Sequence, residues 1–178
     1  HMLAIGSERF IPGSGDGGEK GLDRSTERSV GEAVRECVEW NGFACAAHPF
    51  ERVPPLQRLL LRRGTWTAAD LETPGLGAIQ FHNGVRDRGF HEGMRAWTRL
   101  LLAGNRVAAI GGSDSHGDMN RRRRIIMPLV LAGEDRSHTF GAVRTAVRAK
   151  SRTASDILDG LRQGRAVVTE GPFLSLTV

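Results

Sequence analysis

The sequence predicts an α/β fold in which helices alternate with buried parallel strands. Three short apolar runs, at residues 43–47, 77–81 and 107–110, each follow a helical pattern or a turn, and each ends in polar residues and glycine. Continuous apolar runs of this length are typical of strands buried on both faces. Because they alternate with helices, we expect a parallel sheet, with any functional site at the carboxyl ends of its strands.

The boundaries of these elements follow from capping and stop signals. Ser29 and Glu32 have the spacing of a capping box, and Asn41 followed by glycine is typical of a helix end. The elements expected in this half are a strand at 3–5, a helix at 30–38, a strand at 43–47, a helix from 54 to 60, a strand at 77–81, a helix at 91–103 and a strand at 107–110.

After Gly117 the pattern becomes richer in strands. Thr153 and Asp156 form a second pair of capping residues for one more helix. The expected elements are strands at 125–131, 142–149, 165–169 and 173–178, with the helix at 153–161.

Composition and charge indicate which classes of binding partner and which location to expect. The net charge of +5 and the isoelectric point near 10.4 favour anionic partners such as phosphate esters, nucleic acid or acidic proteins, although arginines that only solvate the surface would give the same charge. An apolar run long enough for a membrane span is lacking, and no signal peptide opens the sequence. Cys37 and Cys45 have no zinc-site spacing and are expected in the core. We expect a cytoplasmic protein.

Three polar residues at strand ends predict a metal site. Asp114 and His116 leave a strand within a glycine-flanked turn, where a carboxylate and an imidazole two residues apart can reach one ion. His48 follows another apolar strand and precedes a proline, which keeps it out of a helix. Carboxylate and neutral imidazole are common ligands of zinc, manganese and iron. We therefore expect a divalent ion at His48, Asp114 and His116.

The order of these motifs resembles the PHP family, the polymerase and histidinol phosphatase type of metal-dependent phosphoesterase. The likeness rests on His48-Pro49, then residues 81–84 (Phe-His-Asn-Gly), then residues 112–116 (Gly-Ser-Asp-Ser-His), and covers about residues 28–178. Residues 153–172, with their Leu-Arg-x-Gly-Arg-x-Val-Val-Thr-x-Gly-Pro run, resemble the subgroup that includes carbamate-ester hydrolases.

The resemblance implies a distorted β/α barrel with metal ions at its strand ends, where metal-activated water hydrolyses phosphate or related esters. On that basis we expect one domain over residues 1–178, with an incomplete barrel to about residue 120 and a β-rich extension over about 121–178. His48, Asp114 and His116 would be the metal ligands, and no catalytic residue is assigned beyond them. Candidate substrate-binding residues are His82, Asn83, Arg121 and Arg124, with His82 equally consistent with a turn residue.

The sequence also departs from the family pattern. The family has a His-x-His pair and further ligands before the His-Pro strand, and these would lie upstream of residue 1. Gln80 stands where relatives have a glutamate, and a neutral amide is a poor metal ligand. His1, followed by an apolar strand, is either a fourth ligand or a residue left from a tag. Residues 1–178 alone are therefore expected to bind a metal weakly and to show little or no hydrolysis.

Two other functions fit parts of the sequence. An arginine-rich nucleic-acid-binding module would use Arg62, Arg63 and residues 121–124, although no recognised nucleic-acid motif is present. A catalytically inert scaffold would keep the fold without the chemistry. A barrel that lacks its first strands leaves an open edge, so we expect homo-oligomers through that edge.

Overall fold

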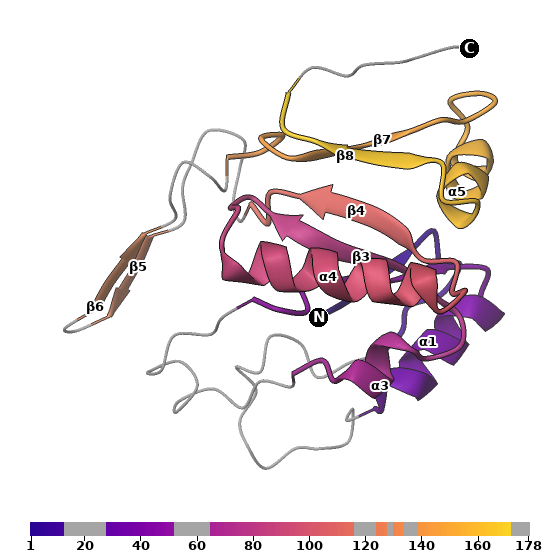
Figure 1. Ribbon diagram of the computed structural model, residues 1–178, viewed down its shortest axis with the longest axis horizontal. Helices are drawn as coiled ribbons and strands as arrows, with labels where there is room; N and C mark the ends of the chain where they lie inside the picture. Colours follow the sequence, from indigo (N-terminus) through magenta and orange to yellow (C-terminus); the bar gives the residue numbers. More distant parts are fainter. Residues whose placement is uncertain (13–27, 52–64, 116–123, 128–129, 134–138, 172–178) are drawn as a thin grey trace.

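The computed structural model describes residues 1–12, 28–51, 65–115, 124–127, 130–133 and 139–171. Its centre is a four-stranded sheet in the order β1-β2-β3-β4, formed by Met2–Ile5, Phe43–Ala47, Leu76–Asn83 and Ala108–Gly112 (Figure 1). The last three strands are mutually parallel, and β1 runs antiparallel to β2. The α/β class and the three parallel strands are therefore confirmed. The described strands form an open sheet and two smaller two-stranded sheets, and they do not close into a barrel.

Helix α1 (Val30–Glu39) begins where the sequence predicts and ends one residue later. The Ser29 hydroxyl accepts from the backbone N–H of Glu32, while the Glu32 carboxylate accepts from the backbone N–H of Ser29. The Ser29 hydroxyl also donates to the Glu32 carboxylate. This bond, followed by the one from the Ser29 N–H, lowers the pKa of Glu32 below its usual value, since both favour the ionised carboxylate. Beyond the helix, Asn41 adopts a left-handed backbone with φ of 56°.

Two other helices differ from the prediction. Helix α4 (Arg88–Leu102) begins three residues earlier than expected because the Asp87 carboxylate caps it, accepting from the backbone N–H of Phe90 at 3.0 Å. The short helix α3 (Ala68–Leu71) was not predicted, although Thr67 and Asp70 form a capping box like that of α1. The helix expected from 54 to 60 lies outside the described residues.

The C-terminal part contains two antiparallel pairs. The single strand expected at 125–131 is wrong: β5 (Arg124–Met127) and β6 (Val130–Gly133) pair with each other, and Pro128, which lies between them, has no N–H for a continuous strand. The predicted strand at 142–149, helix at 153–161 and strand at 165–169 correspond to β7 (Arg144–Val147), α5 (Ala154–Arg162) and β8 (Ala166–Thr169). β7 pairs with β8. The strand expected at 173–178 falls outside the described residues.

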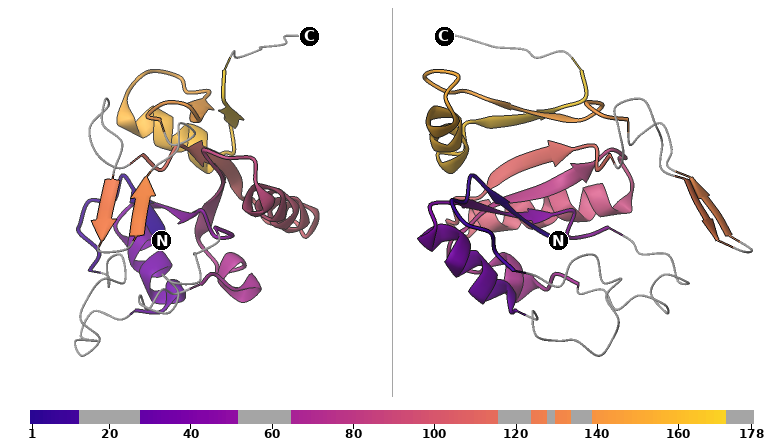
Figure 2. Two further views of the ribbon diagram at one scale, coloured as in Figure 1. Left: turned by 90° about the vertical axis from the view of Figure 1, so that its left-hand side faces the viewer. Right: turned by 180° about the vertical axis from the view of Figure 1, so that it is seen from behind.

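The sheet has a hydrophobic core on each face. Neighbouring residues of β2 alternate between the cores, with Ala44 on one side and Cys45 on the other. The first core joins the sheet to α1, α3 and α4, and the second joins it to α5, β7 and β8. Figures 1 and 2 show the helical layer and the C-terminal layer on opposite sides of the sheet. Cys37 and Cys45 are buried free thiols, and burial raises the pKa of Cys45 to about 12.

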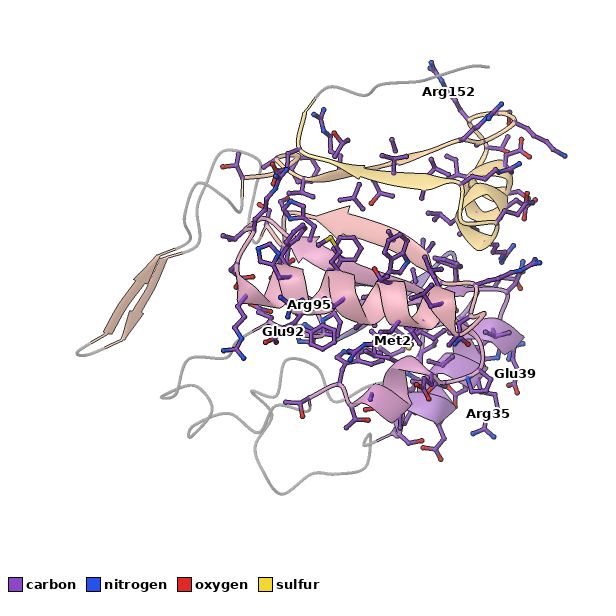
Figure 3. All side chains as sticks on the ribbon, in the orientation of Figure 1. Met2, Arg35, Glu39, Glu92, Arg95 and Arg152 are labelled. Carbon is purple, nitrogen blue, oxygen red and sulfur yellow. The ribbon has the colours of Figure 1, made fainter. Side chains whose placement is uncertain are left out.

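The described arginines are spread over several elements. Figure 3 labels Arg35 on α1, Arg95 on α4 and Arg152 in the loop before α5, and all three are exposed. The arginines on which the nucleic-acid reading depends, at 62, 63 and 121–123, lie outside the described residues, and only the backbone of Arg124 is described. None of the helices in the described ranges is both long and apolar enough to cross a bilayer.

Candidate metal centre

The carboxyl ends of the three parallel strands bring polar side chains to one edge of the sheet. His48 follows β2 directly, Asn83 is the last residue of β3, and Asp114 lies two residues beyond β4. The pairing of β3 with β4 sets Asn83 beside Gly112, so that the two strands end at the same level. The parallel register therefore gathers residues from three distant parts of the sequence.

Three of these side chains form a cluster with the donor atoms of a metal site. One ligand atom from each of His48, Glu51 and Asp114 lies within 4.8 Å of the others. Glu51 reaches the cluster through a tight turn, in which its backbone N–H donates to the His48 carbonyl at 3.0 Å. Pro49 occupies the second position of that turn, where its fixed φ is favourable.

Both strand-end ligands have a left-handed backbone. The φ angles are 32° at His48 and 48° at Asp114. For an L-residue this region costs about 1–2 kcal/mol, although histidine and aspartate enter it more readily than most residues. Backbone strain of this kind is common where a side chain must point at a functional site. At both positions it turns the chain sharply just after a buried strand.

His48 is held on both ring nitrogens. Its Nδ1 lies 2.8 Å from a Glu51 carboxylate oxygen, and its Nε2 lies 3.2 Å from Nδ1 of His1. The His1 carbonyl is fixed as well, because it accepts from the backbone N–H of Ala47 at 3.0 Å and from the Trp66 indole at 3.2 Å. These bonds place residue 1 beside the end of β2, whether His1 is native or is left from a tag.

A chain of two side-chain hydrogen bonds orients Asp114 from the neighbouring strand. The Gln80 amide donates to Oδ1 of Asn83 at 2.9 Å, and the Asn83 amide donates to the Asp114 carboxylate at 3.3 Å. A glutamate at position 80 could not donate in this way when ionised. Gln80, a weak ligand in itself, therefore acts as a positioning residue: it fixes the Asn83 amide so that its N–H group faces Asp114.

The donor set fits a divalent transition metal. An imidazole with two carboxylates suits zinc, manganese or iron. Ligand atoms of one such ion, bound at about 2.0–2.2 Å, lie roughly 3 to 4.4 Å apart, so only a small closure of the cluster is needed. The 3.2 Å between the His1 and His48 nitrogens is close to the separation of about 3.3 Å expected for two ligands of a tetrahedral ion. Glu51 can then be a ligand itself, or it can accept a hydrogen bond from Nδ1 of His48 and so fix the tautomer of that ring.

A cleft of about 150 Å³ opens beside the cluster. His48 and Glu51 of the cluster line it, together with Asn83, Gln80 and Asp87. The remaining wall comes mainly from the turn after His48, from β3 and from the start of α4: Pro49, Phe50, Phe81, Val85 and Phe90. The cleft gives a small molecule access to the cluster.

His82 lies in β3 and not in a turn, and it is buried, with 3% of its surface exposed. Its Nε2 is 2.6 Å from a Glu170 carboxylate oxygen at the end of β8, and Arg86 donates two hydrogen bonds to the same carboxylate. The bond with His82, and then that with Arg86, holds the pKa of Glu170 below its usual value. His82 does not line the cleft. It ties the C-terminal layer to the sheet.

The structure thus brings together part of the expected site. His48, Asp114 and Asn83 meet, with His1 beside them, whereas His116 and Arg121 lie outside the described residues and only the backbone of Arg124, in β5, is described. Sequence reasoning missed Glu51 and the positioning role of Gln80. The His-Pro-x-Glu spacing carried a signal for Glu51, since a turn at Pro49 returns the fourth residue to the first.

Comparisons of the chain with protein-family models, with curated proteins and with solved structures find no match.

Proposed function

We propose that the chain is a weakly active divalent-metal-dependent hydrolase of phosphate or related esters, akin to the PHP family, with its sheet forming part of an incomplete barrel. The observation that carries the proposal is the convergence of His48, Glu51 and Asp114, whose ligand atoms lie within 4.8 Å at the carboxyl ends of parallel strands. Sites in α/β folds form at such strand ends. The cleft beside the cluster supplies the route for substrate.

The protein groups have separate tasks in this reaction. When bound, a divalent cation supplies Lewis acidity and lowers the pKa of a coordinated water to about 7. His48, Asp114 and His116 would hold the cation, and Glu51 would keep the imidazole of His48 in one tautomer. Asn83 and Gln80 would hold Asp114 in the orientation of a ligand. In the overall reaction water adds to phosphorus, the bond to the ester oxygen breaks, and the leaving alcohol takes up a proton.

The phosphoryl group of the substrate is negatively charged, so its binding requires cationic groups. The clustered carboxylates would repel it, so the bound cation must come first. Arg121 and Arg124 follow Asp114 closely in sequence and are proposed to bind the phosphoryl oxygens, since a guanidinium can donate two parallel hydrogen bonds. With few ligands in residues 1–178, we expect one ion of micromolar or weaker affinity.

Metal titration of the purified chain tests the proposal. Isothermal titration with Mn²⁺ and Zn²⁺ should give a single site, and His48→Ala should weaken it at least 100-fold because the imidazole is central to the cluster. The matched control is His91→Ala, which removes an exposed histidine of α4 and should leave affinity unchanged. A metal at 100 times its dissociation constant should also raise the free energy of unfolding by about 2.7 kcal/mol.

The outcomes separate the competing functions. Equal metal affinity of the wild type and His48→Ala would rule out this centre. Metal binding without hydrolysis of phosphate monoesters would leave the inert-scaffold reading for residues 1–178. Salt-sensitive binding of DNA or RNA without metal binding would favour the nucleic-acid reading.

A further inference from the structure

The cleft beside the metal centre is lined by both aromatic and polar side chains. Phe50, Phe81, Phe90 and the exposed Val85 supply much of its apolar lining, and we call the whole cleft the aromatic cleft. Helix α4 comes close enough to form its wall because its first turns carry glycine. A Cβ at Gly89 would lie 2.8 Å from the Phe50 carbonyl, and one at Gly93 would lie 2.5 Å from the Phe81 Cβ. Glycine at these two positions therefore lets the backbone of α4 approach Phe50 and Phe81 closely.

The charges that line the aromatic cleft disfavour a second anionic group on the substrate. Among the described residues that line the cleft, the ionisable side chains are those of His48, Glu51 and Asp87, and none is arginine or lysine. The amino end of a helix usually attracts anions, but at α4 the Asp87 carboxylate already accepts from the Phe90 N–H. A second phosphate or a carboxylate on the substrate would therefore meet negative charge.

The size of the cleft limits the group that fits. A volume of about 150 Å³ is comparable to the engineered apolar cavity in another protein that binds one benzene molecule. A nucleobase with its ribose is about twice as large as such a ring and would extend well beyond the cleft. One six-membered ring, or a branched alkyl group of similar size, matches the available space.

We propose that the aromatic cleft binds an uncharged, ring-sized apolar group of the substrate, so that the chain acts on monoesters of small aromatic or aliphatic alcohols in preference to nucleotides and diphosphates. The reaction rests on the function proposed above, whereas the binding of the apolar group rests on the cleft alone. Val85 is the residue best suited to test it, since it lines the cleft and is 43% exposed, outside both cores.

Binding is tested without metal and without turnover. Saturation-transfer NMR of the metal-free chain with benzyl alcohol should show binding in the millimolar range, typical of a ring-sized fragment. Glycerol and pyrophosphate should give no signal and no competition. Val85→Asp should weaken benzyl alcohol at least fivefold, while Leu102→Asp, at an 83% exposed position of α4, should not. Absence of benzyl alcohol binding, or equal binding to Val85→Asp, would overturn the proposal.

Turnover provides the second arm. Benzyl phosphate and methyl phosphate have leaving alcohols of similar basicity, so a difference in kcat/KM reports binding of the ring. We expect a ratio of at least 10 in favour of benzyl phosphate, reduced in Val85→Asp. Equal kcat/KM values would refute the cleft proposal and leave the hydrolase standing. Hydrolysis of neither ester, with benzyl alcohol binding intact, would refute the hydrolase and leave the cleft.

Discussion

The end of α1 and the ends of β2 and β4 use the same backbone conformation for different purposes. Asn41 has φ of 56°, and there the left-handed turn satisfies helix carbonyls: the Gly42 N–H donates to the Cys37 carbonyl at 2.7 Å. His48 and Asp114 are also left-handed, but they point ligand atoms at a shared cluster. The left-handed residue at the helix end thus stabilises the fold, whereas those at the strand ends orient ligand side chains toward the proposed metal site. The two regions should respond oppositely to substitution.

The largest expected effect is at the strand ends. Asp114→Asn keeps a residue that tolerates the left-handed region but removes a negative charge close to Glu51. Metal affinity should fall at least 100-fold, because a carboxylate ligand is lost. The metal-free protein should gain on the order of 0.5–1 kcal/mol, since two carboxylates no longer repel each other. Titration calorimetry and urea unfolding measure the two quantities. Unfolding that becomes easier by more than about 1 kcal/mol would show that Asp114 serves the fold.

The helix end should show the reverse pattern. Asn41→Ala places a less tolerant residue at φ of 56° and removes the Oδ1 acceptor of Arg162, 3.0 Å away. We expect a loss of about 1–2 kcal/mol in the free energy of unfolding. Asn41→Gly restores backbone freedom and should lose less. Metal affinity should equal that of the wild type in both variants, and a changed affinity would mean that the two regions are coupled.

The sequence was informative wherever a signal is local. The capping box at Ser29, the N-cap at Thr153, the stop at Asn41 and the three buried strands follow from short-range patterns, and the structure has them. The early start of α4 at Asp87 was missed because an apolar stripe does not reveal which polar residue caps it. Glu51 was missed for a different reason: its role depends on a turn that bends it back to His48.

Contacts between distant segments could not be read from the sequence at all. In the sequence, Gln80 is recognisable only as the loss of a metal ligand. Its positioning role is not, because that role depends on the distance to Asn83 and on the register of β3 with β4. The contact between His82 and Glu170 spans 88 positions and needs β7 and β8 on the far face of the sheet. The antiparallel direction of β1, which brings His1 to His48, likewise depends on tertiary pairing.

The smallest expected effect concerns the contact between His82 and Glu170, which joins two layers of the fold and lies away from both left-handed regions. The lowered pKa of Glu170 means that the native state favours the ionised carboxylate. Its contribution to stability is therefore complete above pH ~4.3, the usual pKa of a glutamate, and is lost as pH falls through the lowered value.

Glu170→Gln should lower Tm slightly at pH 7, and the difference in Tm from the wild type should narrow below pH ~4.3. Arg86→Gln keeps the His82 partner and should give a smaller gap. Thermal unfolding followed by circular dichroism from pH 3 to 7 measures both. A gap that is constant over this range would mean that Glu170 acts through shape and not through charge.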